Sequence, residues 1–219
     1  DNFWEEYDAF GTLVHDEPPS VAEDDDGRVV VRGALRWVRP DGATVALVED
    51  RSLTHVPLDD GAYAIDLDTR LVPGADCRLD RTPFTTWGGY GGLTVRGAGD
   101  WTDTRLLLDG GSTHERVLGD AGRWLDLTGR PPGGDPDERA GIALLDHPDN
   151  RRHPTPWYAS TRADTYGDEG WSNFANAAFL WHDGMDLAEG EELRVRHRVI
   201  VHDGEWDADR LDAAWAALA

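Results

Sequence analysis

The sequence predicts an all-β fold, a large antiparallel β-sandwich that ends in a short helix. Runs with strand character recur along most of the 219 residues, and clusters of turn-forming residues separate them. Strands do not alternate with helices in the way that a parallel sheet requires. Hydrophobic residues make up 39% of the chain, which is enough for a substantial core. We therefore expect one β-sandwich domain over residues 1–219.

The N-terminal half predicts an antiparallel meander. Three runs rich in apolar and β-branched residues carry the strand pattern: residues 28–38, 44–56 and 62–71. Pro40-Asp41-Gly42 and Asp59-Asp60-Gly61 lie between them and are typical turn sequences. In the third run, Tyr63, Ile65 and Leu67 alternate with an alanine and two aspartates, which indicates a strand with one buried face.

The C-terminal half continues the strand pattern after a glycine-rich bend at residues 88–92. Its strand-like runs are residues 93–96, 104–108, 114–118, 123–127, 142–145, 176–181 and 193–202. In the last run, Arg194, Arg196 and Arg198 share one face, and apolar residues with His197 share the other. The arginines could clamp a substrate anion, or they could pair with carboxylates on neighbouring strands, which is more common in an acidic chain.

Residues 207–219 carry a helical pattern. Asp207 is suited to the N-cap position, and Leu211, Trp215 and Leu218 form one apolar stripe. We expect this helix to pack against an edge of the sheet.

The chain is strongly acidic. It has 43 acidic residues and 21 basic ones, all of them arginine, for a net charge of −22. Such a surface repels nucleic acid and anionic membranes, so we expect neither as a partner. The acid excess without lysine fits a halophilic, salt-adapted proteome or a GC-rich genome. No apolar run approaches the roughly 18 residues that span a bilayer, and we expect a cytoplasmic protein.

The strongest candidate site follows a short apolar run. Residues 146–158, DHPDNRRHPTPWY, combine histidine, aspartate, asparagine and arginine with prolines that exclude an immediate helix. His147 and His153 titrate near neutral pH, and Asn150 both donates and accepts hydrogen bonds. Trp157 offers a flat face that stacks on a sugar ring, so the mixture indicates a polyhydroxylated ligand. The alternative is structural, because Asp and Asn before proline form turns and a Trp beside a strand often fills a core.

Five segments resemble the PmoA-like family of unknown function: LDHPDNRRHPTPWY, ALVEDRSL, YGGLTVR, RWLDLTG and LAEGEELRVRHRVIVHDG. They occur in the order that the family has and cover nearly the whole chain. The resemblance implies a β-sandwich similar to the galactose mutarotase supersandwich, whose relatives act on or bind carbohydrates. The residues that match the family's motifs are Glu49, Arg51, Arg96, His147, Asn150, His153, Trp157 and His202.

The chain departs from the family at its beginning. Family members carry an upstream His-His-Arg-Gly segment, then Gly-His-Gly-Asp and Asp-Phe-Trp, and this chain begins at what resembles the last of these, Asp1-Asn2-Phe3-Trp4. We therefore expect upstream strands to be missing from it. An incomplete sandwich would expose a sheet edge, which strand pairing or a homo-oligomer would cover.

The first functional hypothesis is a carbohydrate-active enzyme, an epimerase or a lyase or hydrolase that acts on a sugar or an oxidised sugar. Such chemistry needs one base and one acid on opposite sides of the reacting carbon. We expect Glu49 as the base and His147 or His153 as the acid. Arg51 or Arg96 would hold a hydroxyl or carboxylate of the substrate. The remaining substrate contacts would be Asn150, Trp157 and His202. For Glu49 and Arg51 the alternative is an ion pair on one strand face.

The second hypothesis is a non-catalytic carbohydrate-binding or scaffolding module. Ten tryptophans supply stacking faces, and those near predicted loops are best placed for a ligand: Trp87, Trp101, Trp157 and Trp171. Trp37, Trp124 and Trp181 lie in strand patterns, so we expect them in the core.

The third hypothesis is a metal-dependent enzyme, for which these residues supply oxygen and nitrogen ligands: Asp146, His147, His153, His182 and His202. No HExxH spacing is present, so we favour this hypothesis least and predict no metal site. The single Cys77 excludes an internal disulfide and a cysteine-based zinc site. The sequence identifies no cofactor.

Overall fold

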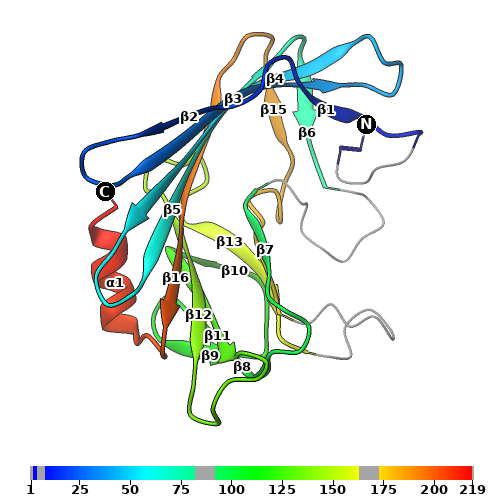
Figure 1. Cartoon of the computed structure of the whole chain (residues 1–219). Helices are drawn as coiled ribbons and strands as arrows, with labels where there is room; N and C mark the ends of the chain where they lie inside the picture. The colour runs from blue at the N-terminus through cyan, green and yellow to red at the C-terminus, as the bar shows by residue number, and fades with distance from the viewer. Residues whose placement is uncertain (1, 4–7, 82–91, 163–172, 219) are drawn as a thin grey trace.

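Antiparallel sheets make up most of the structure (Figure 1). A computed structural model describes residues 2–3, 8–81, 92–162 and 173–218. Within this part of the chain, the prediction of an all-β sandwich with a short C-terminal helix is confirmed. Trp87, Trp171, most of the glycine-rich bend and the outer residues of the Asp1–Trp4 segment lie outside the described residues.

The largest sheet has ten strands. They are β1 (Thr12–His15), β2 (Ser20–Glu23), β3 (Val29–Val38), β4 (Val45–Pro57), β5 (Tyr63–Pro73), β8 (Thr102–Leu108), β9 (Ser112–His114), β11 (Trp124–Arg130), β12 (Ala140–Asp146) and β16 (Leu193–Asp203). The order is β1-β3-β4-β5-β16-β12-β11-β8-β9, and β2 also pairs with β3. The predicted meander is present as β3, β4 and β5. Strand β16 lies between β5 and β12 and so joins the meander to the later strands.

Two smaller sheets and the helix complete the described part of the chain. Four strands form the second sheet in the order β10-β13-β14-β7: β7 (Thr94–Arg96), β10 (Arg116–Gly122), β13 (Thr155–Ser160) and β14 (Phe174–Ala177). The third sheet pairs β6 (Cys77–Leu79) with β15 (Met185–Leu187). The helix α1 spans Ala208–Ala216, and the predicted N-cap is confirmed, because Asp207 accepts a hydrogen bond from the Arg210 amide at 2.9 Å.

The four-stranded sheet packs on one face of the ten-stranded sheet, which we call the inner face. Alternating residues of β8, β11 and β12 supply this core, among them Leu106, Leu125 and Leu144, all fully buried. Trp157 and Ala159 of β13 meet them from the smaller sheet. Burial of one such leucine or aromatic side chain stabilises a fold by about 2 kcal/mol, so this contact is a main source of stability.

Helix α1 packs on the opposite face, which we call the outer face. The side chains that alternate with the inner-face residues turn toward the helix, including Trp124, Ala143 and Leu145. Leu211 on the helix is fully buried against them. Figure 1 shows α1 beside β16 and β5, on the side of the large sheet away from β13 and β10. The strands β3, β4 and β5 continue beyond the helix (Figure 1).

Several details differ from the sequence predictions. Helix α1 packs on a face of the large sheet and not at its edge, and the strand predicted at residues 176–181 is β14, which ends at Ala177. The run predicted at residues 114–118 is divided between β9 and β10, since β9 ends at His114 and β10 begins at Arg116. Strand β13 was expected to be loop, because prolines 154 and 156 flank its first residue. The strand accommodates Pro156 at a register shift of β10, where a regular ladder hydrogen bond is not required. No helix among the described residues is long and apolar enough to span a bilayer.

Candidate functional site

The predicted site loop begins where β12 ends, at Asp146. This carboxylate is 1% exposed and is surrounded by donors of the loop that follows it. Its Oδ1 accepts from Asn150 Nδ2 at 2.7 Å, and its Oδ2 accepts from the Thr155 amide at 2.9 Å. The Nδ1 of His153 lies 2.7 Å from the same Oδ2. Burial raises the pKa of Asp146, while these donors oppose the shift. Asp146 therefore holds both ends of the loop.

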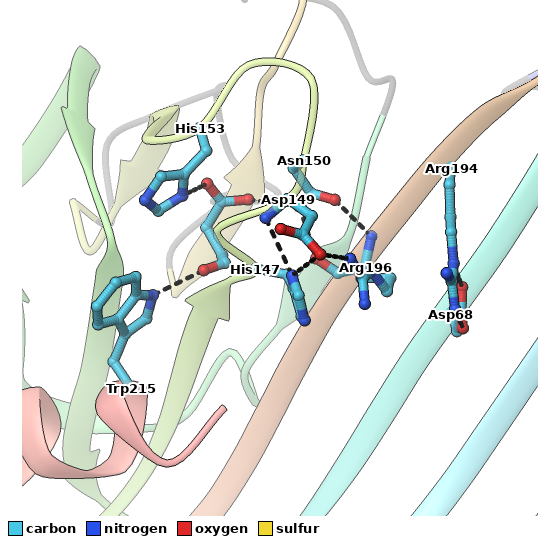
Figure 2. Close-up of polar contacts among 9 residues, drawn as sticks. Asp68, His147, Asp149, Asn150, His153, Arg194, Arg196 and Trp215 are labelled. Atoms are coloured by element: carbon cyan, nitrogen blue, oxygen red, sulfur yellow. Dashed lines mark hydrogen bonds and ion pairs between the residues drawn. The ribbon is translucent and has the colours of Figure 1, made fainter. Parts of the chain in front are cut away.

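Asn150 fastens the middle of the loop to β16. Its Oδ1 accepts from the Arg196 amide at 2.8 Å, and its Nδ2 also donates to the Arg196 carbonyl at 2.6 Å (Figure 2). The side chain thus binds the peptide groups of β16 as a neighbouring strand would. Asn150, predicted as a substrate contact, has its amide occupied by the protein itself.

Helix α1 supports the loop from the outer face. The Nε1 of Trp215 donates to the Asp146 carbonyl at 2.8 Å. The Trp215 ring stacks on His153 with centroids 5.6 Å apart and an interplanar angle of 12° (Figure 2). The Arg123 guanidinium also lies over the Trp215 ring, 5.0 Å from its centroid. His153 is therefore held by a carboxylate and an aromatic ring together.

His147 turns toward the outer face. Its amide donates to the Arg196 carbonyl at 3.3 Å, so the pairing of β12 with β16 continues one residue past the strand and places His147 opposite Arg196. The His147 Nδ1 accepts from the Asp149 amide at 3.1 Å, and Asp149 also forms an ion pair with Arg196 (Figure 2). Burial lowers the pKa of His147, and the charge of Arg196 lowers it further. His147 is thus neutral at pH 7, with its proton on Nε2.

Strand register places four more polar side chains in line with His147. Arg196 pairs with Asp68 of β5, Asp68 pairs with Ser52 of β4, and Ser52 pairs with Arg32 of β3. We call His147, Arg196, Asp68, Ser52 and Arg32 the polar row. Strands lie about 4.8 Å apart, so the row extends about 19 Å across the outer face.

Ion pairs accompany the polar row. Arg194 donates to both carboxylate oxygens of Asp68, at 2.8 and 2.5 Å (Figure 2). Arg198 binds Asp66 in the same two-pronged way, at 2.5 and 2.8 Å. Each of the three arginines of β16 therefore has an aspartate partner, which supports the ion-pair alternative over the anion clamp. The Arg194 guanidinium holds the pKa of Asp68 below its usual range, so Asp68 stays ionised.

A groove of about 350 Å³ lies on the outer face over β3, β4 and β5. The residues that line it are Arg32, Gly33, Ala34, Asp50, Arg51, Ser52, Asp68 and Arg70. Three members of the polar row are thus in its wall. Its volume falls within the range of small-molecule sites, and its described lining contains no aromatic ring.

Glu49 and Arg51 pair with each other on the inner face of β4, although Arg51 also borders the groove. Glu49 is 0% exposed; its Oε1 accepts from Arg51 Nε at 2.6 Å, and its Oε2 accepts from Trp37 Nε1 at 2.7 Å. The same-face ion pair that was the structural alternative is present. The structure does not bring Glu49, the expected base, together with His147, one of the two expected acids, because the sheet separates their side chains.

Three further predicted site residues lie elsewhere. Trp157 is fully buried in the sandwich core, where its Nε1 donates to the Gly122 carbonyl at 3.0 Å, so its ring has no face free to stack on a sugar. His202 is buried on the outer face, 3.0 Å from Asp126 Oδ1 and stacked under Trp206. Arg96 ends β7 in the four-stranded sheet.

The predicted tryptophans differ in their burial. Trp124, predicted for the core, is fully buried, whereas Trp37 and Trp181, also predicted for the core, are partly buried and pack against core clusters. Trp101, a candidate ligand contact, is partly buried and packs against the core as well. Among the residues that the structure describes, no group of three or more His, Cys, Asp and Glu side chains is arranged to hold a metal ion.

Sequence reasoning missed the outer-face groove. The alternation of Asp66 and Asp68 with apolar residues was recognised as a strand pattern, but nothing local identifies β16 as the partner of β5. Arg194 and Asp68 are 126 positions apart in the chain. Arginines repeat at every second position of β16 and aspartates at every second position of β5. This matching pattern could have identified the two strands as partners.

The comparisons with known proteins identify the family. A family model described as "Family of unknown function (DUF6807)" matches residues 1–216. The chain belongs to this family. The PmoA-like name suggested by the sequence resemblance is not confirmed. No curated protein matches.

One similar solved structure is described as "Putative kojibiose phosphorylase from human microbiome", with 9% sequence identity and a TM-score of 0.30. The match covers 94% of this chain and 24% of that one, so this chain spans about a quarter of that protein's length. This degree of similarity is too low to support an argument about fold or function.

Proposed function

We propose that this protein binds a neutral carbohydrate in the outer-face groove. The observation that carries the proposal is the polar row, which runs along the groove from Arg32 to Asp68 and continues to His147. Sugar hydroxyls both donate and accept hydrogen bonds, and the row offers donors and acceptors at the regular spacing of the strands.

The balance of charge around the row favours a neutral ligand. Four guanidiniums and four carboxylates belong to the row or lie beside it: those of Arg32, Arg70, Arg194 and Arg196, and those of Asp50, Asp68, Asp149 and Glu192. Arg51, which also lines the groove, is paired with the buried Glu49. The chain as a whole carries −22, which disfavours the approach of an anion. An arginine paired with one aspartate still has N–H groups left for a ligand, because a guanidinium has five.

Saturation-transfer NMR with a panel of neutral saccharides and uronates tests the proposal. We expect transfer to neutral saccharides and at least a tenfold loss of affinity in Asp68→Asn. The matched control is Asp66→Asn, since Asp66 lies on the same strand and face and pairs with Arg198 in the same way but does not line the groove. Equal binding by both variants would contradict the proposal, and so would a protein that binds no saccharide in the panel.

The position of His147 favours a second function, a proton-transfer enzyme that acts on the same ligand. Its side chain is 13% exposed, neutral at pH 7 and at the end of the polar row. A neutral imidazole can accept or donate a proton at a carbon next to a carbonyl or at an anomeric centre. Asp68 would act as a fixed negative charge, because Arg194 keeps it ionised.

The same NMR spectra distinguish the enzyme from the binding module. New resonances or proton exchange at one carbon, lost in His147→Ala and retained in His114→Ala, would establish catalysis. His114 suits the control because it lies on β9 at the far edge of the sheet. Binding without any chemical change in the saccharide would support the non-catalytic binding module.

A further inference from the structure

A small cavity lies beneath the site loop, on the inner side of β16. Its volume is about 20 Å³. Polar side chains from the loop and its anchor line one part of it, namely Asp146, Asn150 and Thr155. Leu193, Val195 and His197 of β16 line another part. The cavity therefore lies between the first residue of β13 and the inner face of β16.

Two buried polar atoms of this lining have no hydrogen-bond partner among the described residues. They are Thr155 Oγ1 and His197 Nδ1. Thr155 is 2% exposed and His197 is 3% exposed, so bulk water does not reach either side chain freely. A buried polar atom without a partner costs about 1–3 kcal/mol, and native proteins usually satisfy such atoms with protein groups or ordered water.

The surroundings of His197 define what its Nδ1 requires. The other ring nitrogen, Nε2, faces Asp146 Oδ1 at a distance of 3.5 Å. Burial lowers the pKa of His197 to about 4, and the nearby His147 acts in the same direction, so the ring is neutral at pH 7. With the Nε2 proton directed at the carboxylate, Nδ1 carries a lone pair and needs a donor.

We infer that this cavity is an internal binding site for one water-sized polar molecule, held by Thr155 Oγ1 and His197 Nδ1. A volume of about 20 Å³ exceeds the roughly 10–15 Å³ that one water requires and leaves no room for a larger ligand. The occupant donates to His197 and also bonds the Thr155 hydroxyl, as water does. The two unpaired polar atoms exclude an apolar guest.

The bound molecule joins β13 to β16 below the loop. Asn150 makes the corresponding connection on the loop itself, through the peptide groups of Arg196. The occupant also fixes the His197 tautomer that directs Nε2–H toward Asp146. We therefore assign His197 as a positioning residue for the loop that carries His147, independently of what the groove binds.

A crystal structure at a resolution that shows internal waters tests this site directly. We expect one ordered peak about 3 Å from both Thr155 Oγ1 and His197 Nδ1 in the wild type and in Thr155→Ser, and no peak in the isosteric Thr155→Val. A wild-type cavity without a peak, in a structure that shows other internal waters, would overturn the inference.

Nitrogen-15 NMR of the histidine rings gives a second, spectroscopic test. His197 Nδ1 should have the shift of an unprotonated, hydrogen-bonded nitrogen in the wild type and in Thr155→Ser. In Thr155→Val the shift should move toward that of a nitrogen without a donor. A protonated Nδ1, or a shift unchanged in Thr155→Val, would overturn the inference. Should Thr155→Val fail to fold, the wild-type protonation state still decides.

Discussion

Glu49 and His147 lie on opposite faces of the ten-stranded sheet. Glu49 pairs across strands with Leu35 and Leu71, which belong to the inner face, whereas His147 lies opposite Arg196 on the outer face. Both residues match motifs of the PmoA-like family, but a sequence motif does not show on which face of a sheet a side chain lies. One substrate carbon cannot contact both side chains while they lie on opposite faces of the sheet.

Glu49→Gln should lower stability without changing ligand binding in the groove. The buried carboxylate accepts hydrogen bonds from Trp37 and Arg51, and weakening charge-assisted bonds of this kind costs about 2 kcal/mol. Urea unfolding measures the first effect and saccharide titration the second. If a folded Glu49→Gln variant did not bind a saccharide that the wild type binds, the prediction would be wrong and Glu49 would be assigned to the binding site.

Arg196→Gln should raise the pKa of His147. Burial is the main cause of the lowered pKa and the Arg196 charge is the next, so removing that charge moves the pKa back toward 6.5. Proton NMR of the imidazole follows the titration directly. Arg198→Gln is the control, because Arg198 pairs with Asp66 on the same face and does not contribute to the His147 shift. Equal shifts in the two variants would mean that His147 does not face Arg196.

Gly141→Ala should destabilise the fold by roughly 1–3 kcal/mol through overpacking. A Cβ at Gly141 would lie 2.2 Å from His202 Cε1, and His202 cannot move away easily because Trp206 stacks on it with centroids 4.4 Å apart. Gly99→Ala is the matched control, since a Cβ there meets nothing within 4 Å. Thermal unfolding of both variants checks the prediction, and a Gly141→Ala protein as stable as Gly99→Ala would contradict it.

Stability should fall as the pH is lowered from about 6.5 to about 4, in part because of His197. Its pKa is about 4 when folded, against 6.5 for an unperturbed imidazole, so over this interval the unfolded chain binds a proton that the folded one does not. The resulting loss is on the order of 3 kcal/mol. The lowered pKa of His147 acts in the same direction, and the raised pKa of Asp146 acts in the opposite one.

The contribution of His197 can be isolated with His197→Gln, which removes the titrating ring and keeps a polar side chain. Urea unfolding of wild type and variant at several pH values gives the two slopes. The variant should lose less stability than the wild type between pH 6.5 and 4. Parallel curves would show that His197 is not held neutral by burial.

Local signals were sufficient to predict most of the strands. Alternation and turn residues located β3, β4, β5 and β16 to within two residues at each end, and Asp207 marked the start of the helix. These features depend on a few neighbouring residues, and they can be recognised without knowing what packs against them.

The candidate site could not be assembled from local signals in the same way. Its row depends on β16 pairing with β5, and that pairing joins distant segments whose partners no short motif specifies. Trp157 illustrates the same limit. The prolines around it indicated a loop, but the packing of β13 against Leu106 and Leu125 places the ring in the core. Burial of that much apolar surface outweighs the preference of proline for loops.

The hydrogen bond from Trp215 to the Asp146 carbonyl has a consequence for biosynthesis. The two residues are 69 positions apart, so at about 5–20 residues per second the ribosome adds Trp215 several seconds after Asp146. Throughout that interval His153 has no aromatic ring to stack on and the end of β12 has no indole donor. The nascent chain can thus pair β3, β4 and β5 early, yet the segment bearing His147 and His153 reaches its final shape only after β16 and α1 have been synthesised and docked.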